Sequence, residues 1–422
     1  MKVLIIGINY APEIISTGVY TTGLAEFLAA EGHTVDVITA VPYYPAWKVM
    51  DGWPKFSYRR ETSASGIRIF HAPLYVPRLP GGLKRILHNA SFALTAAPAA
   101  AWLALRRRPD IVVVVAPSLI SALTGWMAAR FARAKSWLHI QDFEAEAAIA
   151  TGLLKAGTPL ARMAARFERW MLGRFDRVSS ISPPMVERLL TKGVAIRRVY
   201  EFRNWADLSA VSPLGNVSPL RRELGITTPY VALYSGNIAN KQGLEIIPEM
   251  ARHLGDRRDI TIVICGDGPM RARLEEQARD FPLIRFLPLQ PRDRLSDLLG
   301  MADVHLLPQI AGAVDLVLPS KLANMLASGR PVLATTPADT ALGREVAGCG
   351  EVVAPGDAAG MARALAALLD DPERRADLGR AARRRAVDRW DGAGILGRLQ
   401  AEMACLIQLP ATIYIHKETK TP

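Results

Sequence analysis

The chain has 422 residues, which is too long for one compact core and predicts two domains of about 200 residues each. Half of the residues are hydrophobic and 22% are charged, a globular composition that excludes an intrinsically disordered protein. The formal net charge of +12 favours an anionic partner, but the sequence has no zinc-finger spacing, arginine-rich arm or RNA-binding aromatic motif, so we expect no nucleic-acid partner.

The sequence opens with MKVLIIGINYAPE, which lacks the basic head, apolar run and small-residue cleavage site of a secretory signal. The longest apolar run, 89–105, contains Pro98 and is shorter than the roughly 20 residues needed to cross a bilayer. The three cysteines, Cys265, Cys349 and Cys405, match no metal or redox spacing, and we interpret them as small buried side chains. These features predict a cytoplasmic protein without a membrane-spanning helix.

Short apolar runs alternate with helical patterns along the whole chain. In the first half, the predicted strands lie at residues 3–8, 35–39, 111–116, 136–140 and 177–182. In the second half, they lie at residues 230–236, 260–266, 284–289, 303–308 and 331–335. Strands that are apolar throughout and separated by helices form parallel sheets covered on both faces. The pattern therefore predicts an α/β protein with two Rossmann-like domains.

The boundary between the domains is expected in a stretch rich in proline, serine and asparagine, from Asn204 to about Gly225. We therefore predict a first domain at residues 1–205 and a second at 206–385. A helical stretch at 386–408 is expected to dock back toward the first domain, and the tail, 409–422, is expected to be irregular.

Several strand-to-helix turns carry small or basic residues. The first turn has no G-x-G-x-x-G fingerprint, but Gly18 near the start of its helix allows a backbone or a phosphate to come close. In the second domain the turns are SGNIANKQGLE (235–245) with Lys241, CGDGP (265–269), and PSK (319–321), where Ser320 is predicted to cap a short helix. Because the carboxyl ends of parallel strands meet at one edge, the three turns predict a cradle for a nucleotide diphosphate. The alternatives are a solvated loop lysine and an ordinary crossover helix.

In this order the motifs resemble retaining glycosyltransferase family 4. The phrases GINYAPE, PYYP (42–45), LHIQDFE (138–144), FRNWAD (202–207), FLPLQP (286–291) and SKLANMLASGRPV are similar to its WcaI-like branch, which is named for colanic acid biosynthesis. The resemblance covers residues 1 to about 405. It implies the GT-B fold, in which two Rossmann-like domains have parallel sheets that face each other across a cleft. The N-terminal domain would receive the acceptor, and the C-terminal domain would bind the nucleotide sugar.

The sequence departs from the family at several expected donor-site positions. The two family glutamates fall on Leu316 and Asn324, and the nearest acid is Asp315. The phosphate-binding arginine falls on Asn237, which leaves Lys241 as the main cation of that loop, with Lys321 as a replacement for the missing charge. Asn324 is still able to hydrogen-bond a ribose.

In the first domain, the His-Asp pair often found in the family reads Gln141-Asp142, with His139 two residues earlier. The resemblance thus implies Asp142, His139 and Asp315 as candidate catalytic residues. The candidate donor-binding residues are Gly18, Ser235, Asn237, Lys241, Gly266, Leu287, Leu318, Ser320, Lys321 and Asn324. No metal or other cofactor is implied.

The function implied by the resemblance is sugar transfer with retention at the anomeric carbon, by front-face attack assisted by the leaving diphosphate. The donor would be a nucleotide sugar, with GDP-fucose favoured and uridine donors open. The acceptor would be a polyprenyl-diphosphate-linked saccharide in exopolysaccharide biosynthesis. The alternatives are an epimerase or hydrolase of nucleotide sugars on the same scaffold, and a nucleotide-sugar-binding subunit without activity.

A peripheral contact with the anionic inner face of the cell membrane is also expected. Residues 79–175 contain thirteen lysines and arginines against five acidic residues. The stretch 83–108 carries Phe92 and Trp102 between basic ends, and 157–175 combines Arg162, Arg166 and Arg169 with Met163, Phe167 and Trp170. The alternative is that both helices only cover the first sheet while their arginines are solvated.

Overall fold

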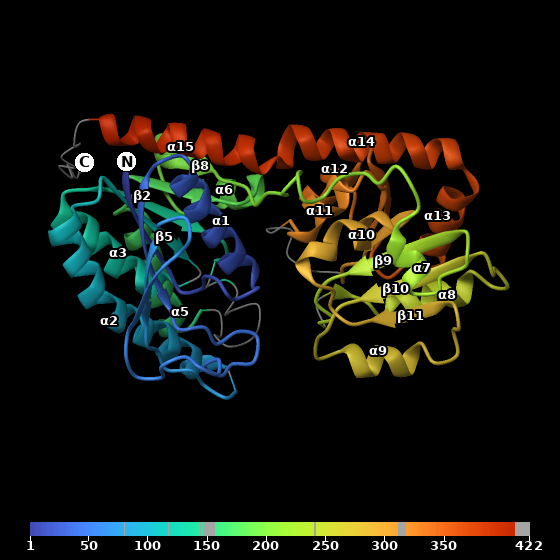
Figure 1. Ribbon diagram of the computed structural model, residues 1–422, viewed down its shortest axis with the longest axis horizontal. Helices are drawn as coiled ribbons and strands as arrows, with labels where there is room; N and C mark the ends of the chain where they lie inside the picture. Colours follow the sequence, from blue (N-terminus) through green and yellow to red (C-terminus); the bar gives the residue numbers. More distant parts are fainter. Residues whose placement is uncertain are drawn as a thin grey trace. The chain divides into compact units, whose positions relative to one another are not determined.

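The computed structural model describes residues 1–79, 81–116, 118–143, 146, 157–239, 242–310 and 318–409. The chain divides into two compact units (Figure 1). The first unit comprises Met1–Ser180, Val186–Phe202 and the chain from Leu396 onward, and the second comprises Ile181–Met185 and Arg203–Ile395. Each unit is an α/β layer structure around its own sheet, which confirms the predicted fold class.

In the described part of the first unit, the sheet has eight strands in the order β3-β4-β2-β1-β5-β6-β7-β8. Their bounds are β1 Lys2–Gly7, β2 Thr34–Ala40, β3 Arg59–Thr62, β4 Arg68–Ala72, β5 Ile111–Ala116, β6 Lys135–Ile140, β7 Arg177–Ser180 and β8 Val199–Glu201. All neighbouring strands are parallel except β3 and β4, which are antiparallel. The central strands are buried on both faces, as their continuous apolar runs predict.

Helices cover both faces of this sheet. Along the chain they are α1 Ser16–Ala30, α2 Gly82–Arg107, α3 Leu119–Ala132, α5 Pro159–Leu172, α6 Pro183–Thr191 and the 3-10 turn η1 Ile196–Arg198. Figure 1 shows α2 and α3 side by side, and both pack on the sheet. The chain also returns through α15, Gly392–Gln408, where Glu402 pairs with Arg177 and Gln400 lies 3.0 Å from His33.

In the second unit, the described residues form a six-stranded, all-parallel sheet in the order β11-β10-β9-β12-β13-β14. The strands are β9 Tyr230–Ser235, β10 Ile260–Cys265, β11 Ile284–Leu287, β12 Val304–Leu307, β13 Val332–Thr335 and β14 Gly350–Val353. The helices are α7 Pro219–Glu223, α8 Ile246–His253, α9 Arg271–Gln277, η3 Arg292–Arg294, α10 Leu295–Gly300, α11 Lys321–Ala327, α12 Ala341–Val346, α13 Ala358–Asp370 and α14 Pro372–Trp390.

The two faces of the second sheet have separate cores. On β9, Val231 and Leu233 join the core with α10, α11 and α14, whereas Ala232 and Tyr234 join the core with α8 and α13. Successive side chains on a strand point to opposite faces, so both faces require apolar residues. This explains why the strand reads as an uninterrupted apolar run in the sequence.

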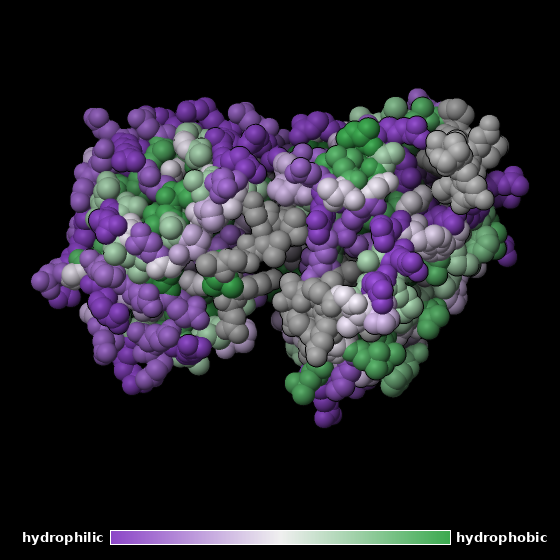
Figure 2. Space-filling view, turned by 180° about the vertical axis from the view of Figure 1, so that it is seen from behind, coloured by the Kyte–Doolittle hydropathy of each residue, from purple (hydrophilic) through white to green (hydrophobic). Residues whose placement is uncertain are grey.

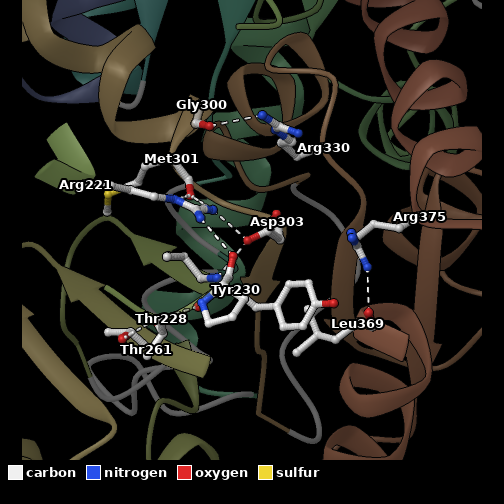
Figure 3. A network of polar contacts seen from close by, with 12 residues as sticks. Arg221, Thr228, Tyr230, Thr261, Gly300, Met301, Asp303, Arg330, Leu369 and Arg375 are labelled. Carbon is white, nitrogen blue, oxygen red and sulfur yellow. Dashed lines mark hydrogen bonds and ion pairs between the residues drawn. The ribbon is translucent and has the colours of Figure 1, made fainter. Parts of the chain in front are cut away.

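A polar network closes the amino ends of the strands of the second sheet (Figure 3). The Arg221 guanidinium donates to the Met301 carbonyl at 2.8 Å and to Asp303 Oδ2 at 2.6 Å. The same Asp303 oxygen accepts the amide of Val231 at 2.8 Å, where β9 begins. The network therefore ties α7 to β9 and to the start of β12, at the edge opposite to the carboxyl ends of the strands.

In the stretch from Asn204 to Gly225, where the domain boundary is predicted, Ala206, Val211 and Leu220 are buried in the core of the second unit. Other sequence predictions were wrong in detail. Cys405 is exposed, whereas Cys265 and Cys349 are buried as predicted. The strands β3, β4, β8 and β14 were not predicted.

Candidate functional site

Three turns of the second unit pack together at the carboxyl ends of its strands. The turn after β9 contains Gly236, whose amide donates to the Cys265 carbonyl at 3.0 Å. The turn after β10 contains Gly266, and a Cβ on it would lie 1.9 Å from the Gly236 carbonyl oxygen. The third turn contributes Lys321, whose Nζ lies 3.2 Å from the position of a Cβ on Gly236. The structure thus brings together the three turns that the sequence predicts to converge.

Lys321 is the first residue of α11, and its side chain reaches to the end of β9. Its Nζ donates to the Tyr234 hydroxyl at 2.8 Å and to Gln242 Oε1 at 3.3 Å, and it lies 4.1 Å from the centroid of the Tyr234 ring. Burial lowers the pKa of Lys321 to about 7. No described carboxylate forms an ion pair with this lysine. The Lys321 amine is therefore able to bind an anion without first breaking an ion pair with a described carboxylate.

The PSK segment is arranged differently from the prediction in one respect. Ser320 stands at the N-cap of α11, but it has helical φ and ψ and its side chain makes no capping hydrogen bond. Its hydroxyl therefore accepts no hydrogen bond from the first turn of α11, and the Leu322 amide donates to the Pro319 carbonyl at 2.9 Å instead. Leu318 is buried in the core of the unit, and Asn324 is partly buried in the first turn of the helix.

The other candidate residues of this unit lie on the same edge. Ser235 ends β9 and pairs with Cys265. Asn237 is exposed, and its carbonyl accepts the Tyr234 hydroxyl at 2.7 Å. The Leu287 carbonyl at the end of β11 accepts the amide of Gly266 at 3.1 Å. Lys241 and Asp315 lie outside the described residues.

The sequence prediction missed three side chains of this site. Tyr234 and Gln242 hold the Lys321 amine, and the Arg271 guanidinium donates to the carbonyls of Gly266 and Leu287. Arg271 therefore fixes the turn after β10 against the end of β11. Tyr234 directly precedes the SGN motif, so a polar group on an otherwise apolar strand was the signal that could have revealed it.

In the first unit, a buried carboxylate joins two loops at the carboxyl ends of the strands. Glu13 Oε1 accepts the amides of Tyr43 and Tyr44, both at 2.8 Å, and Oε2 accepts Asn9 Nδ2 at 2.7 Å. Burial raises the pKa of the Glu13 carboxyl, and these hydrogen bonds offset part of the effect. The two sequence motifs GINYAPE and PYYP are thus parts of one network.

Gly18 lies in the first turn of α1, which begins at Ser16, and it packs against this first loop. A Cβ on Gly18 would lie 3.4 Å from the Glu13 carbonyl oxygen and 3.4 Å from the Tyr10 amide nitrogen. The contact is tight but not prohibitive, because Gly18 has no left-handed φ. Gly18 therefore allows α1 to start close to the loop that Glu13 holds.

The candidate catalytic residues at the carboxyl end of β6, His139 and Asp142, have different surroundings. His139 is 2% exposed, its Nδ1 lies 2.9 Å from Ser179 Oγ, and its Nε2 lies 3.2 Å from Gln141 Nε2. Burial lowers the pKa of His139 to about 3, so the imidazole is neutral at neutral pH. Asp142, by contrast, is exposed just beyond the strand. Asp142 is therefore the more accessible of the two, whereas His139 is buried between Ser179 and Gln141.

Among the described residues, no group of three or more histidines, cysteines, aspartates or glutamates is placed to hold a metal ion. In the same residues, no helix combines the length and apolarity that a bilayer span requires.

Comparisons with known proteins identify both halves of the chain. Residues 17–205 match the glycosyl transferase 4-like domain, and residues 217–385 match glycosyl transferases group 1. Over 352 residues, the chain is 42% identical to WcaI from Escherichia coli (strain K12), a glycosyl transferase that is assigned to colanic acid biosynthesis. That alignment covers 82% of this chain and 85% of the relative.

Solved structures show the same fold at low identity. Sucrose-phosphate synthase from Thermosynechococcus elongatus matches with a TM-score of 0.72 at 18% identity, over 96% of this chain and 99% of that chain. HepE from Anabaena, in complex with UDP and glucose, matches with a TM-score of 0.67 at 14% identity, over 96% of this chain and 100% of that chain. These matches establish the GT-B architecture.

Proposed function

This chain belongs to the glycosyltransferase family that contains WcaI, and we propose that it transfers a sugar from a nucleotide-sugar donor to a lipid-diphosphate-linked saccharide in exopolysaccharide biosynthesis. The observation that carries this proposal is the convergence of three turns on Lys321 at one sheet edge. Parallel α/β sheets bind ligands at this edge, and a partly buried amine beside closely packed glycine turns suits a diphosphate. The Gly236, Gly266 and Lys321 turns would hold the donor.

The proposed chemistry needs charge stabilisation more than a strong base. The acceptor hydroxyl oxygen forms a bond to the anomeric carbon on the face from which the diphosphate leaves, and the hydroxyl proton passes to a diphosphate oxygen. Retention of configuration follows from attack on that face. Lys321 and Lys241 would stabilise the negative charge that develops on the diphosphate. Asp142 would orient the acceptor, so Asp142→Asn is expected to lower turnover while leaving donor affinity unchanged.

The proposed donor is GDP-fucose, and this choice rests only on the resemblance of the sequence motifs to the WcaI-like branch. The Asn324 side chain in the first turn of α11 would bind the ribose, and the backbone near Leu287 would meet the base. Because backbone groups are the same at every residue, the sequence does not reveal which base they would bind. Calorimetric titration with GDP, UDP and ADP tests the choice, and a clear preference for UDP or ADP would contradict it.

The membrane contact that we propose uses surface residues of the first unit, and the structure corrects which ones are available. Phe92 is fully buried, so it does not face a membrane. Instead, Leu83, Leu87, Leu94 and Leu105 of α2 are exposed, by 70, 50, 75 and 62%. Their spacings of four, seven and eleven residues place them on one face of the helix.

Basic residues accompany this apolar surface. The Arg60 guanidinium lies 5.6 Å from the centroid of the Trp102 ring, and that of Arg174 lies 4.9 Å from that of the Trp170 ring. Both tryptophans are about 40% exposed, and Met163 on α5 is 62% exposed. Figure 2 shows hydrophobic surface along the outer edge of the first unit, to the right in that view. Apolar side chains among arginines suit the headgroup region of an anionic bilayer.

Sedimentation with vesicles tests the membrane contact. We expect binding to anionic vesicles, weak binding to neutral ones, and release at high salt, because each basic residue near such a surface contributes about 1 kcal/mol that ions screen. The variant Leu83→Ser with Leu94→Ser should bind less, whereas Val217→Ser, a 74% exposed control in the second unit, should not differ from the parent. Equal, negligible binding of the parent to both vesicle types would refute the contact and leave the transferase proposal intact.

Incubation with labelled nucleotide sugars, with and without a polyprenyl-diphosphate-linked saccharide, tests the activity. Release of nucleotide that depends on the acceptor supports transfer, and the anomeric configuration of the product tests retention. Turnover without acceptor would indicate an epimerase or hydrolase instead. Saturable binding without turnover would indicate a nucleotide-sugar-binding subunit.

A further inference from the structure

The Lys321 amine is held by two neutral acceptors. The Tyr234 hydroxyl donates its own proton to the Asn237 carbonyl at 2.7 Å, so its oxygen is left to accept the amine at 2.8 Å. Gln242 Oε1 is the second acceptor, at 3.3 Å. The Tyr234 hydroxyl is also a poor source of negative charge, because burial raises its pKa.

The number of acceptors suits an uncharged amine better than an ammonium ion. A neutral amine has two N–H groups, which the Tyr234 hydroxyl and Gln242 satisfy. An ammonium ion has three, and no third acceptor for Lys321 lies among the described residues. Lys321 is partly buried, and a charge that is partly removed from water without a counter-ion is costly. Among the residues that the structure describes, the unliganded site therefore offers Lys321 neither a third hydrogen-bond acceptor nor a negative charge.

The titratable groups on the neighbouring described elements do not supply that charge. On β9 the group is the Tyr234 phenol. In the turn after β10, the Cys265 thiol donates to the Pro288 carbonyl at 3.3 Å, and burial raises its pKa. The Asp267 carboxylate in the same turn accepts the Gly268 amide at 2.8 Å and is solvent-exposed. None of them forms an ion pair with Lys321.

We propose that Tyr234 is a positioning residue that holds the Lys321 amine for the donor, and that this amine takes up one proton from solution when the nucleotide sugar binds. The inference rests on the proposed function, because the diphosphate supplies the missing acceptor and the missing charge. A pKa of about 7 in the free protein makes both forms of Lys321 present near neutral pH, as the inference requires. Binding raises that pKa, since the bound diphosphate favours the charged amine.

The sign of the pH dependence follows directly. Below pH 7 the amine of the free protein is already charged, so donor affinity does not change with pH. Above pH 7 the free amine is neutral and binding must include proton uptake, so affinity falls by about tenfold per pH unit until the pKa of the bound state is reached. At pH 8, most of one proton is expected to be taken up for each donor molecule that binds.

Calorimetric titration of the parent protein in buffers of different ionisation enthalpy measures that number. The probe is an intact nucleotide sugar, because both of its phosphates are esterified, whereas a free nucleoside diphosphate has a terminal phosphate that titrates near pH 6. Binding at pH 8 without proton uptake would overturn the inference and leave the donor site standing. No binding at any pH between 6 and 9 would refute the proposed function together with the inference.

Two variants separate the charge from its position. Lys321→Arg remains charged throughout this range, so it should bind the donor without proton uptake and with an affinity that is flat between pH 7 and pH 9. Tyr234→Phe keeps the ring but removes the oxygen that holds the amine, and we expect threefold to tenfold weaker binding even at pH 6.5. Tyr234→Phe binding as tightly as the parent would refute the positioning role. Thermal unfolding of each variant checks that the second unit remains folded.

Discussion

Replacing Gly266 with alanine would test whether the donor turns depend on their close backbone packing. Gly266 has a φ of +148°, a conformation that L-residues rarely adopt, and a Cβ would lie 1.9 Å from the Gly236 carbonyl oxygen. A backbone oxygen cannot rotate away as a side chain can. The variant must therefore move one turn relative to the other or unfold the edge of the sheet.

The magnitude follows from two contributions. A backbone held in such a region costs about 1–3 kcal/mol, and inserting a methyl group into a filled site costs about 1–3 kcal/mol more. We therefore expect Gly266→Ala to destabilise the second unit by roughly 2–6 kcal/mol. Gly255→Ala is the comparison, because Gly255 also has a positive φ, of +61°, but nothing lies within 4 Å of its Cβ position. Gly255→Ala should lower the stability of the second unit by only about 1 kcal/mol.

Hydrogen exchange read by mass spectrometry measures both variants in the full chain. Peptides that cover β9 and β10 should lose protection in Gly266→Ala, and peptides of the first unit should be unchanged and serve as the internal control. Donor affinity, measured by calorimetry, should fall in Gly266→Ala and stay near the parent value in Gly255→Ala. Equal protection and equal donor affinity in the two variants would refute the argument from packing.

Three further changes test other parts of the molecule. Lys241→Ala is expected to weaken donor binding by about tenfold to a hundredfold, since a charge-assisted hydrogen bond contributes about 1.5–3 kcal/mol; an unchanged dissociation constant in calorimetry would remove Lys241 from the site. Asp303→Asn should lower stability by roughly 2–4 kcal/mol in thermal unfolding, because it leaves the Arg221 guanidinium without its charge partner, whereas Asp51→Asn in an exposed ion pair should have no measurable effect. Glu13→Ala should lower the free energy of unfolding by roughly 2–4 kcal/mol and weaken the apparent affinity for the acceptor saccharide, because three N–H groups lose the carboxylate that accepts their hydrogen bonds. If the variant unfolds and turns over like the parent protein, the two loops do not depend on this carboxylate.

The sequence predicted the central strands well because burial on both faces leaves an uninterrupted apolar run, as in β1, β5 and β10. It did not predict β3, whose RRET sequence is largely exposed, because pairing with β4 rather than local pattern makes this segment a strand. Phe92 was placed wrongly for a related reason. The side of α2 that faces the sheet is fixed by packing against α3 and the strands, which helical periodicity alone does not reveal.

In the candidate site too, features that depend on local sequence were predictable, and contacts between distant segments were not. The glycine turns were predictable, because a strand end followed by small residues marks a place where backbones approach each other. The polar group of Tyr234 on an apolar strand was a visible signal, but its contact with Lys321 was not predictable, because that contact depends on a long side chain from α11 reaching a strand distant in sequence. The contact of Gln242 with Lys321 was not predictable for the same reason. Ser320 has a residue type that favours capping, yet its helical backbone prevents its hydroxyl from doing so.

The return of α15 to the first unit has a consequence for how the chain folds during synthesis. Arg177 pairs with Glu402, and His33 contacts Gln400, so partners of the first unit leave the ribosome more than two hundred residues after Arg177. The second unit, whose residues end at Ile395, is synthesised before the first unit is complete. Domains that are continuous in sequence fold in order from the N-terminus. Here the first unit remains incomplete until α15, the last described helix, has emerged. A nascent chain that is stalled before residue 396 should therefore leave the first unit more sensitive to protease than it is in the finished protein.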